Sequence, residues 1–187
     1  MQSEVLQLDV QGTPQAWISA EQAALHYARG AIVWFDGDSP MVTLRGGYNV
    51  ASGRQSTIEV HPIIAVRGSA KLNLFDVVPN CTRAKLFRRD RSMCAYCGET
   101  FKEQELQCEH IVPASKGGAW SWMNLVAACG HCNSKKAART PEEARMPLLF
   151  LPYTPSRFED FLLVGRNIRA DVHEWLAARL PRGSRLC

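Results

Sequence analysis

The chain has 187 residues, of which 46% are hydrophobic and 21% are charged. These proportions are those of a globular protein, and they exclude wholesale disorder and collagen-like repeats. No apolar run approaches the roughly 20 residues that cross a bilayer, and the early acidic residues Glu4 and Asp9 do not fit a signal peptide. We therefore expect a soluble, cytoplasmic protein with no membrane partner.

Charge is distributed unevenly along the chain, although the net charge is only +4. Residues 1–80 carry a net charge of −2, residues 81–145 of +4 and residues 146–187 of +2. Each basic side chain that neutralises a phosphate releases counterions, so a basic segment favours a polyanionic partner. A solvated surface explains such charges more often, and the charges alone do not identify a partner.

Residues 1–80 are predicted to form a small α+β lobe. Apolar and polar residues alternate over residues 5–10 as in a β-strand. Ser19 and Gln22 have the spacing of a capping box, which predicts a helix that ends at Gly30. Further strands are predicted over residues 31–35 and 41–44, and a strand or strands around Pro62 over residues 58–66. Nothing in this lobe resembles a catalytic constellation.

Seven cysteines in a chain without an export signal favour free or metal-bound thiols over disulfides. Four of them form two CxxC pairs, a spacing that lets thiolates surround a tetrahedral zinc ion: Cys94, Cys97, Cys129 and Cys132. A redox CxxC normally occurs singly in a βαβ context, which is missing here. We therefore predict a structural Zn²⁺ site, with the chemistry in the 31 residues between the pairs. The spacing pairs none of the other three cysteines, and the simplest interpretation is that they are buried thiols or thiols without a specific role: Cys81, Cys108 and Cys187.

The segment from the first cysteine pair onward is predicted to run strand, loop, helix. The strand covers residues 104–112, the loop covers residues 115–118, and the helix begins near the second cysteine pair. Thr140 and Glu143 then have the spacing of a second capping box, with a proline at the first helical position.

Six motifs follow one another in this region. In chain order they are Cys94-x2-Cys97, Glu109-His110-x2-Pro113, Gly117-Gly118, Asn124-Leu125, Cys129-x2-Cys132-Asn133-x2-Lys136 and Arg139-Thr-Pro. The set resembles HNH endonucleases of the zinc-bound, four-cysteine type. The resemblance covers roughly residues 86–145, and residues 1–80 are similar, in pattern only, to the leader of small stand-alone members.

The resemblance implies a ββα-metal fold, in which a β-hairpin and a helix hold one divalent ion. His110 matches the first histidine of the family name, Asn124 matches the central asparagine, and Asn133 matches the last position. Glu109 stands where aspartate is usual, and the resemblance implies that Glu109 and Asn133 bind the catalytic Mg²⁺ or Mn²⁺. The extra methylene of glutamate moves the carboxylate by on the order of 1.5 Å, and a misplacement of about 1 Å can lower a rate roughly 100-fold.

The same residues suit the hydrolysis of a phosphodiester. Histidine exchanges protons near neutral pH, which makes His110 a suitable general base. Glu109 alternates to the other face of a strand, so base and metal ligand do not compete for one position. Asn124 is expected to orient the histidine loop by hydrogen bonds. Three basic residues beyond the last ligand are expected to hold flanking phosphates: Lys135, Lys136 and Arg139.

The chain changes character after residue 145. Residues 146–155 are apolar and interrupted by prolines, and apolar residues then recur at helical spacing around Val172 and Leu176. This C-terminal helix either caps the core or mediates a homodimer, and the sequence does not choose. We predict an α+β protein of three parts: a small α+β N-terminal lobe (1–80), an HNH ββα-metal core with zinc knuckles (81–145), and an extended segment with a C-terminal docking helix (146–187).

The leading functional prediction is a metal-dependent HNH endonuclease that nicks or cuts DNA, with His110 as general base. The alternative is a zinc-stabilised nucleic-acid-binding module with an inactive nuclease site, which the glutamate at position 109 would explain. The joint presence of His110, Asn124, Asn133 and Glu109 favours the enzyme. A third hypothesis, a zinc ribbon that binds proteins through residues 146–155, fits the basic segment less well.

Overall fold

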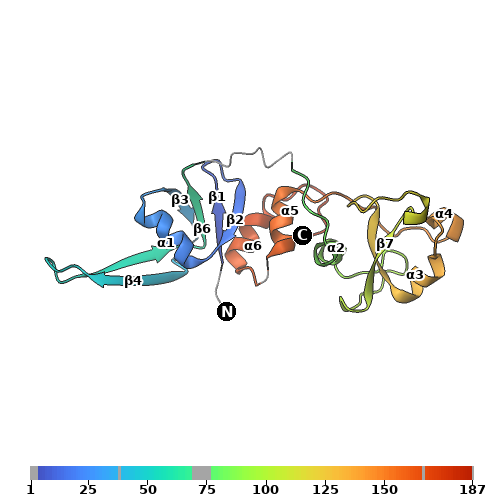
Figure 1. The fold of residues 1–187 in the computed structure, drawn as a ribbon, viewed down its shortest axis with the longest axis horizontal. Helices are drawn as coiled ribbons and strands as arrows, with labels where there is room; N and C mark the ends of the chain where they lie inside the picture. The colour runs from blue at the N-terminus through green and yellow to red at the C-terminus, as the bar shows by residue number, and fades with distance from the viewer. Residues whose placement is uncertain (1–3, 38, 69–76, 166, 187) are drawn as a thin grey trace. The chain divides into compact units, whose positions relative to one another are not determined.

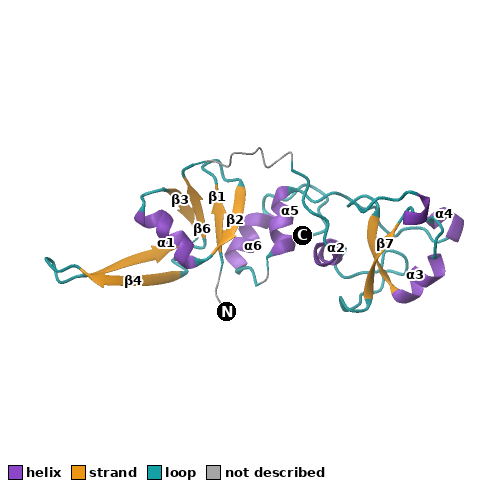
Figure 2. Ribbon diagram, viewed as in Figure 1, coloured by secondary structure: helices purple, strands orange, loops and turns teal. Residues whose placement is uncertain are grey.

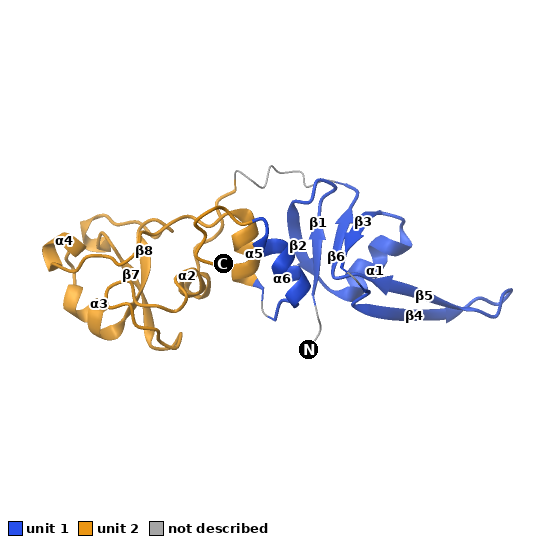
Figure 3. Cartoon of the chain, turned by 180° about the vertical axis from the view of Figure 1, so that it is seen from behind, with its two compact units in different colours: residues 1–76, 165–179 blue, residues 77–164, 180–187 orange. Residues whose placement is uncertain are grey.

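The structure is a computed structural model that describes residues 4–37, 39–68, 77–165 and 167–186 (Figures 1 and 2). It contains helices and strands in both halves of the chain, so the predicted α+β class is confirmed. The chain divides into two compact units (Figure 3): unit 1 comprises residues 1–76 and 165–179, and unit 2 comprises residues 77–164 and 180–187. Within the described ranges, none of the helices combines the length and the hydropathy needed to cross a membrane.

Unit 1 is built on a four-stranded sheet with the order β2-β1-β6-β3. The strands are β1 (Val5–Leu8), β2 (Pro14–Ile18), β3 (Ile32–Asp36) and β6 (Ile63–Val66). β1 is parallel to β6, whereas β1–β2 and β3–β6 are antiparallel pairs. Helix α1 (Ala20–Ala28) begins after Ser19, whose capping box with Gln22 forms as predicted. The buried apolar core of this unit includes Val5, Ala23, Val60, Ile64 and Val66.

A separate antiparallel hairpin completes the strands of unit 1. It consists of β4 (Val42–Tyr48) and β5 (Gln55–Val60). The sequence left open whether residues 58–66 form one strand or more around Pro62, and the structure has β5 and β6 on either side of this proline. Proline cannot donate to a ladder and interrupts a strand, so β5 pairs with β4 while β6 joins the larger sheet.

Unit 2 contains a second hairpin, whose strands are β7 (Leu106–His110) and β8 (Leu125–Cys129). Its register pairs Leu106 with Cys129 and His110 with Leu125. Helix α3 (Gly130–Lys136) follows β8 directly, which gives the strand, strand, helix order that the resemblance implies. The other helices of the unit are α2 (Arg83–Arg89), the 3₁₀ turn η1 (Ala114–Lys116), α4 (Pro141–Ala144) and α5 (Arg157–Val164).

The core of unit 2 includes a buried ion pair that the sequence did not predict. Its apolar residues are Leu86, Phe87, Leu106, Trp122, Leu125, Ala127 and Leu163. Arg89 Nε lies 2.8 Å from Asp90 Oδ1, and both side chains are buried. The Arg89 guanidinium donates to the carbonyl oxygen of Leu125 (2.8 Å), and the Ala127 N–H donates to Asp90 Oδ2 (2.8 Å). The pair therefore fixes β8 to the end of α2.

The C-terminal part of the chain is divided between the two units, unlike the predicted boundaries after residues 80 and 145. Helix α5 belongs to unit 2, and α6 (Ala170–Ala177) belongs to unit 1. Val172, Trp175 and Leu176 of α6 are buried. The apolar face that we expected to cap the core or mediate a homodimer is thus covered within this chain, and homodimerisation gains no support from it.

Candidate active site and metal centre

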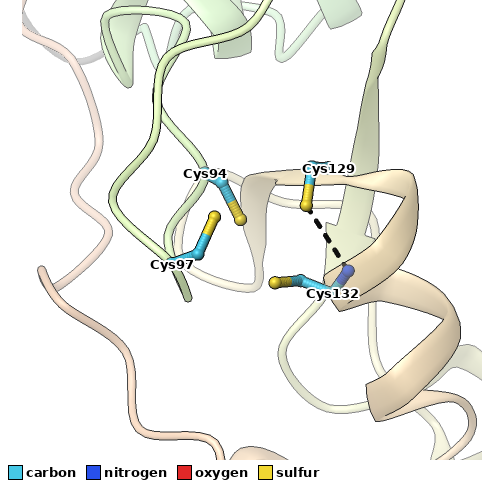
Figure 4. Close-up of side chains that lie close together, drawn as sticks. All are labelled: Cys94, Cys97, Cys129 and Cys132. Atoms are coloured by element: carbon cyan, nitrogen blue, oxygen red, sulfur yellow. Dashed lines mark hydrogen bonds between the residues drawn. The ribbon is translucent and has the colours of Figure 1, made fainter.

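Four cysteine side chains converge in unit 2 (Figure 4). Cys94 and Cys97 lie in the turn that follows α2, Cys129 ends β8, and Cys132 lies in the first turn of α3. Their sulfur atoms all lie within 4.8 Å of one another. The Cys132 N–H also donates to Cys129 Sγ (3.4 Å). Four thiols at these separations form the donor set of a tetrahedral metal site, so the predicted association of the two CxxC pairs is confirmed.

The metal centre is joined to the hairpin through backbone hydrogen bonds. The Ala95 N–H donates to the carbonyl oxygen of Ala127 in β8 (2.8 Å), and the Leu149 N–H donates to the carbonyl oxygen of Ala95 (2.9 Å). Ala128 and Met146 are buried against the cysteines. An ion bound by the cysteines therefore stabilises the hairpin that carries the candidate catalytic residues.

His110 ends β7, at the end of the hairpin opposite to the cysteines. Its ring makes an edge-to-face contact with Trp120, with centroids 5.8 Å apart and planes at 68°. Its carbonyl oxygen accepts a hydrogen bond from Lys136 Nζ (2.7 Å). The ring and the backbone of His110 are thus both held, while the half-buried residue keeps contact with solvent. A general base that acts on water needs this combination.

Asn124 precedes β8 and closes the loop that follows His110. Its Oδ1 accepts a hydrogen bond from the Val112 N–H (2.9 Å), and its Nδ2 donates to the carbonyl oxygens of Val112 (3.1 Å) and Ala119 (2.9 Å). Its own carbonyl oxygen accepts from the Ile111 N–H (2.8 Å). These bonds fit the orienting role that we predicted for Asn124.

The two glycines of the loop are required for different reasons. Gly117 has a φ of +85°, a conformation that side chains disfavour. At Gly118 an added Cβ would lie 1.7 Å from the carbonyl oxygen of Val112 and 2.8 Å from Asn124 Nδ2. The close approach that Asn124 needs to reach Val112 is therefore available only with glycine at position 118.

The two residues expected to bind the catalytic ion lie where β7 meets α3. Lys136 Nζ lies 2.6 Å from Glu109 Oε1, and Asn133 Nδ2 donates to Gln107 Oε1. Gln107 and Glu109 share one face of β7 because side chains alternate along a strand. Asn133 and Lys136 share one face of α3 because they are three residues apart. The Glu109 carboxylate and the Asn133 amide oxygen are hard oxygen donors on facing elements, so the donor set fits Mg²⁺ or Mn²⁺.

Lys136 does not lie where we predicted. Its side chain is fully buried, so it cannot reach a phosphate at the surface, and it instead holds Glu109 and the backbone of His110. Lys135 and Arg139 are exposed. The Arg139 guanidinium donates to the carbonyl oxygens of Lys135 and Lys136, which stabilises the end of α3.

Burial keeps other titratable groups near the site protonated. It raises the pKa of Tyr96, and the negative charges of Glu109 and Cys94 act in the same direction. It also raises the pKa of Cys81 to about 11, with the nearby Arg89 acting in the opposite direction. Neither group is therefore a candidate base or nucleophile at neutral pH.

Comparison with known proteins identifies the same region. The family model described as HNH endonuclease matches residues 94–149. The CRISPR-associated endonuclease Cas9 of Campylobacter jejuni is 35% identical over 80 residues, which are 40% of this chain and 8% of that protein. The protein of the same name from Corynebacterium diphtheriae is 39% identical over 61 residues, which are 29% of this chain and 6% of that protein. The matched part is thus less than a tenth of either relative.

The matched residues are those that form the metal centre, the hairpin and α3. Four cysteines positioned to bind a metal ion, a strand, strand, helix order and the family match agree on one assignment. Residues 94–149 of this chain are a domain of the HNH endonuclease family.

Proposed function

We propose that unit 2 hydrolyses phosphodiester bonds of DNA. The observation that carries the proposal is the placement of His110, Asn124 and Glu109 at one end of the hairpin in an HNH endonuclease domain. The net charge of +4 over residues 81–145 supports a polyanionic substrate.

In the proposed reaction, His110 takes a proton from a water molecule as the water oxygen attacks phosphorus. A new P–O bond forms and the bond from phosphorus to the 3′-oxygen breaks. The leaving oxygen takes a proton from solvent, which gives 5′-phosphate and 3′-hydroxyl ends. The contact with Trp120 and the hydrogen bonds of Asn124 hold the base in place, and such positioning is a large part of catalysis.

The proposal includes two metal ions, one catalytic and one structural. The Glu109 carboxylate and the Asn133 amide oxygen would hold Mg²⁺ or Mn²⁺, with Lys136 fixing one carboxylate oxygen. When bound, such an ion supplies positive charge against the phosphate oxygens. The four cysteines would hold Zn²⁺ as a structural ion, because they already complete a tetrahedron. Lys135 and Arg139, both exposed, would contact flanking phosphates.

A second candidate function is a nucleic-acid-binding module with an inactive nuclease site. One observation favours it: Glu109 already pairs with a buried ammonium group at 2.6 Å. A carboxylate whose charge is balanced in this way binds a divalent cation less tightly than a free one.

Cleavage of supercoiled plasmid by the zinc-loaded protein, with Mg²⁺, Mn²⁺ or no added ion, separates the two. For the nuclease, we expect ion-dependent nicking or linearisation that falls at least about 100-fold in His110→Ala. The matched control is His173→Ala, which changes an exposed histidine of unit 1 and should leave cleavage intact. A folded protein that binds DNA but does not cut it with either ion would support the binding module instead.

A further inference from the structure

Trp120 lies beside the candidate base with its ring exposed but fixed. The residue is 55% exposed, and its Nε1 donates to the carbonyl oxygen of Cys81 (3.0 Å). The other constraint on the ring is its edge-to-face contact with His110. An exposed indole that is held from two sides is a preorganised surface for a flat partner.

A pocket of about 450 Å³ opens beside this ring. Residues that line it include Val78, Asn80, Trp120, Ser121, Met123 and Thr154. Val78 is 65% exposed and Met123 is 57% exposed. None of the lining residues that the structure describes carries a charge, so the described lining suits a neutral flat group with polar edges. Its volume lies in the range of pockets that hold small organic ligands.

Asn124 connects this pocket to the candidate base. It binds Val112, two residues after His110, and Ala119, the residue before Trp120. The Asn124 side chain therefore fixes the separation between the imidazole of His110 and the indole of Trp120. A group in the pocket and a phosphate at His110 would belong to neighbouring parts of one ligand.

We propose that the pocket binds one nucleobase of an unpaired nucleotide next to the phosphate that is cut. This inference rests on the proposed nuclease function and names its substrate class: DNA with a single-stranded segment at the cut, such as a single strand or a flap. A base inside a duplex has both faces covered by its neighbours, so it cannot stack on Trp120 unless it leaves the helix. An unpaired base has a free face, and stacking on an aromatic side chain strengthens binding by roughly 5- to 150-fold per base.

Binding without cleavage tests this proposal on the intact, zinc-loaded protein with no second divalent ion. We would place the fluorescent base 2-aminopurine at successive positions of a single strand and of the same sequence in a duplex. Stacking on Trp120 should quench the fluorescence at one or two positions of the single strand and at none of the duplex. Removing the base at the quenched position should weaken binding about 10- to 100-fold without any change to the protein.

Variants of Trp120 provide a second, independent test of the proposal. Trp120→Ala should weaken binding of the single strand by about the same factor as removal of the base, and should leave the affinity for duplex unchanged. Trp120→Phe should recover most of the lost affinity for the single strand. Trp34→Ala is the matched control, because its indole also donates to a backbone carbonyl, that of Val10, but lies in unit 1. Equal affinity for single strand and duplex, with no effect of the abasic position, would overturn the inference. The proposed nuclease function fails separately, if neither single-stranded nor duplex DNA is cut with Mg²⁺ or Mn²⁺.

Discussion

The ammonium nitrogen of Lys136 lies 2.6 Å from Glu109 Oε1 and 2.7 Å from the carbonyl oxygen of His110, and its side chain is inaccessible to solvent. One residue of α3 therefore fixes two neighbouring residues of β7. Because these two are the candidate metal ligand and the candidate base, the packing of α3 on the hairpin and the geometry of the site depend on the same contact.

Lys136→Met should lower the free energy of unfolding by about 3–5 kcal/mol, because it leaves the buried carboxylate of Glu109 without its partner. The matched control is Lys135→Met, an exposed neighbour in α3, for which we expect a change within about 0.5 kcal/mol. Urea denaturation of both variants measures the difference. Equal stability of the two variants would show that the Lys136 contact does not hold the fold together.

The same two variants separate stability from DNA binding. If Lys135 contacts a phosphate, Lys135→Met should reduce the slope of log affinity against log salt by about 0.9. Lys136→Met, if it remains folded at low temperature, should leave that slope unchanged because the side chain is buried. Titrations of duplex DNA at several salt concentrations give both slopes, and an unchanged slope for Lys135→Met would remove it from the interface.

Asn124→Ala should lower the turnover number for cleavage at least about 10-fold while the Michaelis constant for DNA stays nearly constant. The substitution removes the bonds to Val112 and Ala119, so the loop after His110 loses its orientation, but no predicted DNA contact is lost. Asn124→Asp keeps the acceptor for the Val112 N–H and loses the donors, so it should rescue little. A rise in the Michaelis constant alone would argue that Asn124 contacts substrate directly.

Gly118→Ala should destabilise unit 2 by more than about 3 kcal/mol, because the new Cβ would lie 1.7 Å from the carbonyl oxygen of Val112. Gly117→Ala meets no atom within 4 Å and is strained only by its φ of +85°, so we expect a loss of about 1–2 kcal/mol. Thermal or urea unfolding of the pair checks the order, and a larger effect at Gly117 would contradict it.

Removal of the metal from the four cysteines should unfold the hairpin and α3 selectively. Binding of structural zinc contributes roughly 10–16 kcal/mol to the folding of small zinc modules, so little should hold these elements without it. Hydrogen exchange with and without a strong chelator should show lost protection in β7, β8 and α3 and retained protection in β1 and β6. Uniform loss across both sheets would mean that the two units do not unfold separately.

The thiol of Cys81 should react slowly with alkylating reagents. Burial raises its pKa to about 11, and a raised pKa lowers the thiolate fraction at every pH below that value. At pH 8 the thiolate is on the order of 0.1% of the total, roughly 100-fold less than for a free cysteine. Alkylation at pH 8, followed by mass spectrometry of the peptide, gives the rate, which should rise about tenfold per pH unit toward pH 10. A rate equal to that of a model thiol would contradict the assigned burial.

The local features of the sequence predicted the local structure well. The capping boxes at Ser19 and at Thr140 involve residues three apart, and both form as expected. The CxxC spacing placed each pair of thiols, and the motif order placed the metal centre at the hairpin. Another signal was present but unused: Ser156 and Glu159 exchange hydrogen bonds at the start of α5, with the spacing of a capping box.

Features that depend on distant residues were not predicted. Whether β5 or β6 pairs with β3 is decided by Pro62 and by burial of β6, not by the pattern within any one strand. The burial of Lys136 follows from the contact of α3 with β7, although its spacing of three from Asn133 already placed both on one helix face. The Arg89–Asp90 pair joins α2 to β8 across 35 or more residues, and no local sequence pattern predicts this contact.

Unit 1 is interrupted in the sequence by unit 2, because α6 and its neighbours, residues 165–179, come after residues 77–164. During translation, both cysteine pairs and the whole hairpin are synthesised before α6. Domains generally acquire structure as units while the chain is synthesised. The cysteines and the hairpin are therefore available to bind metal while both units are still incomplete, because unit 1 lacks α6 and unit 2 lacks residues 180–187.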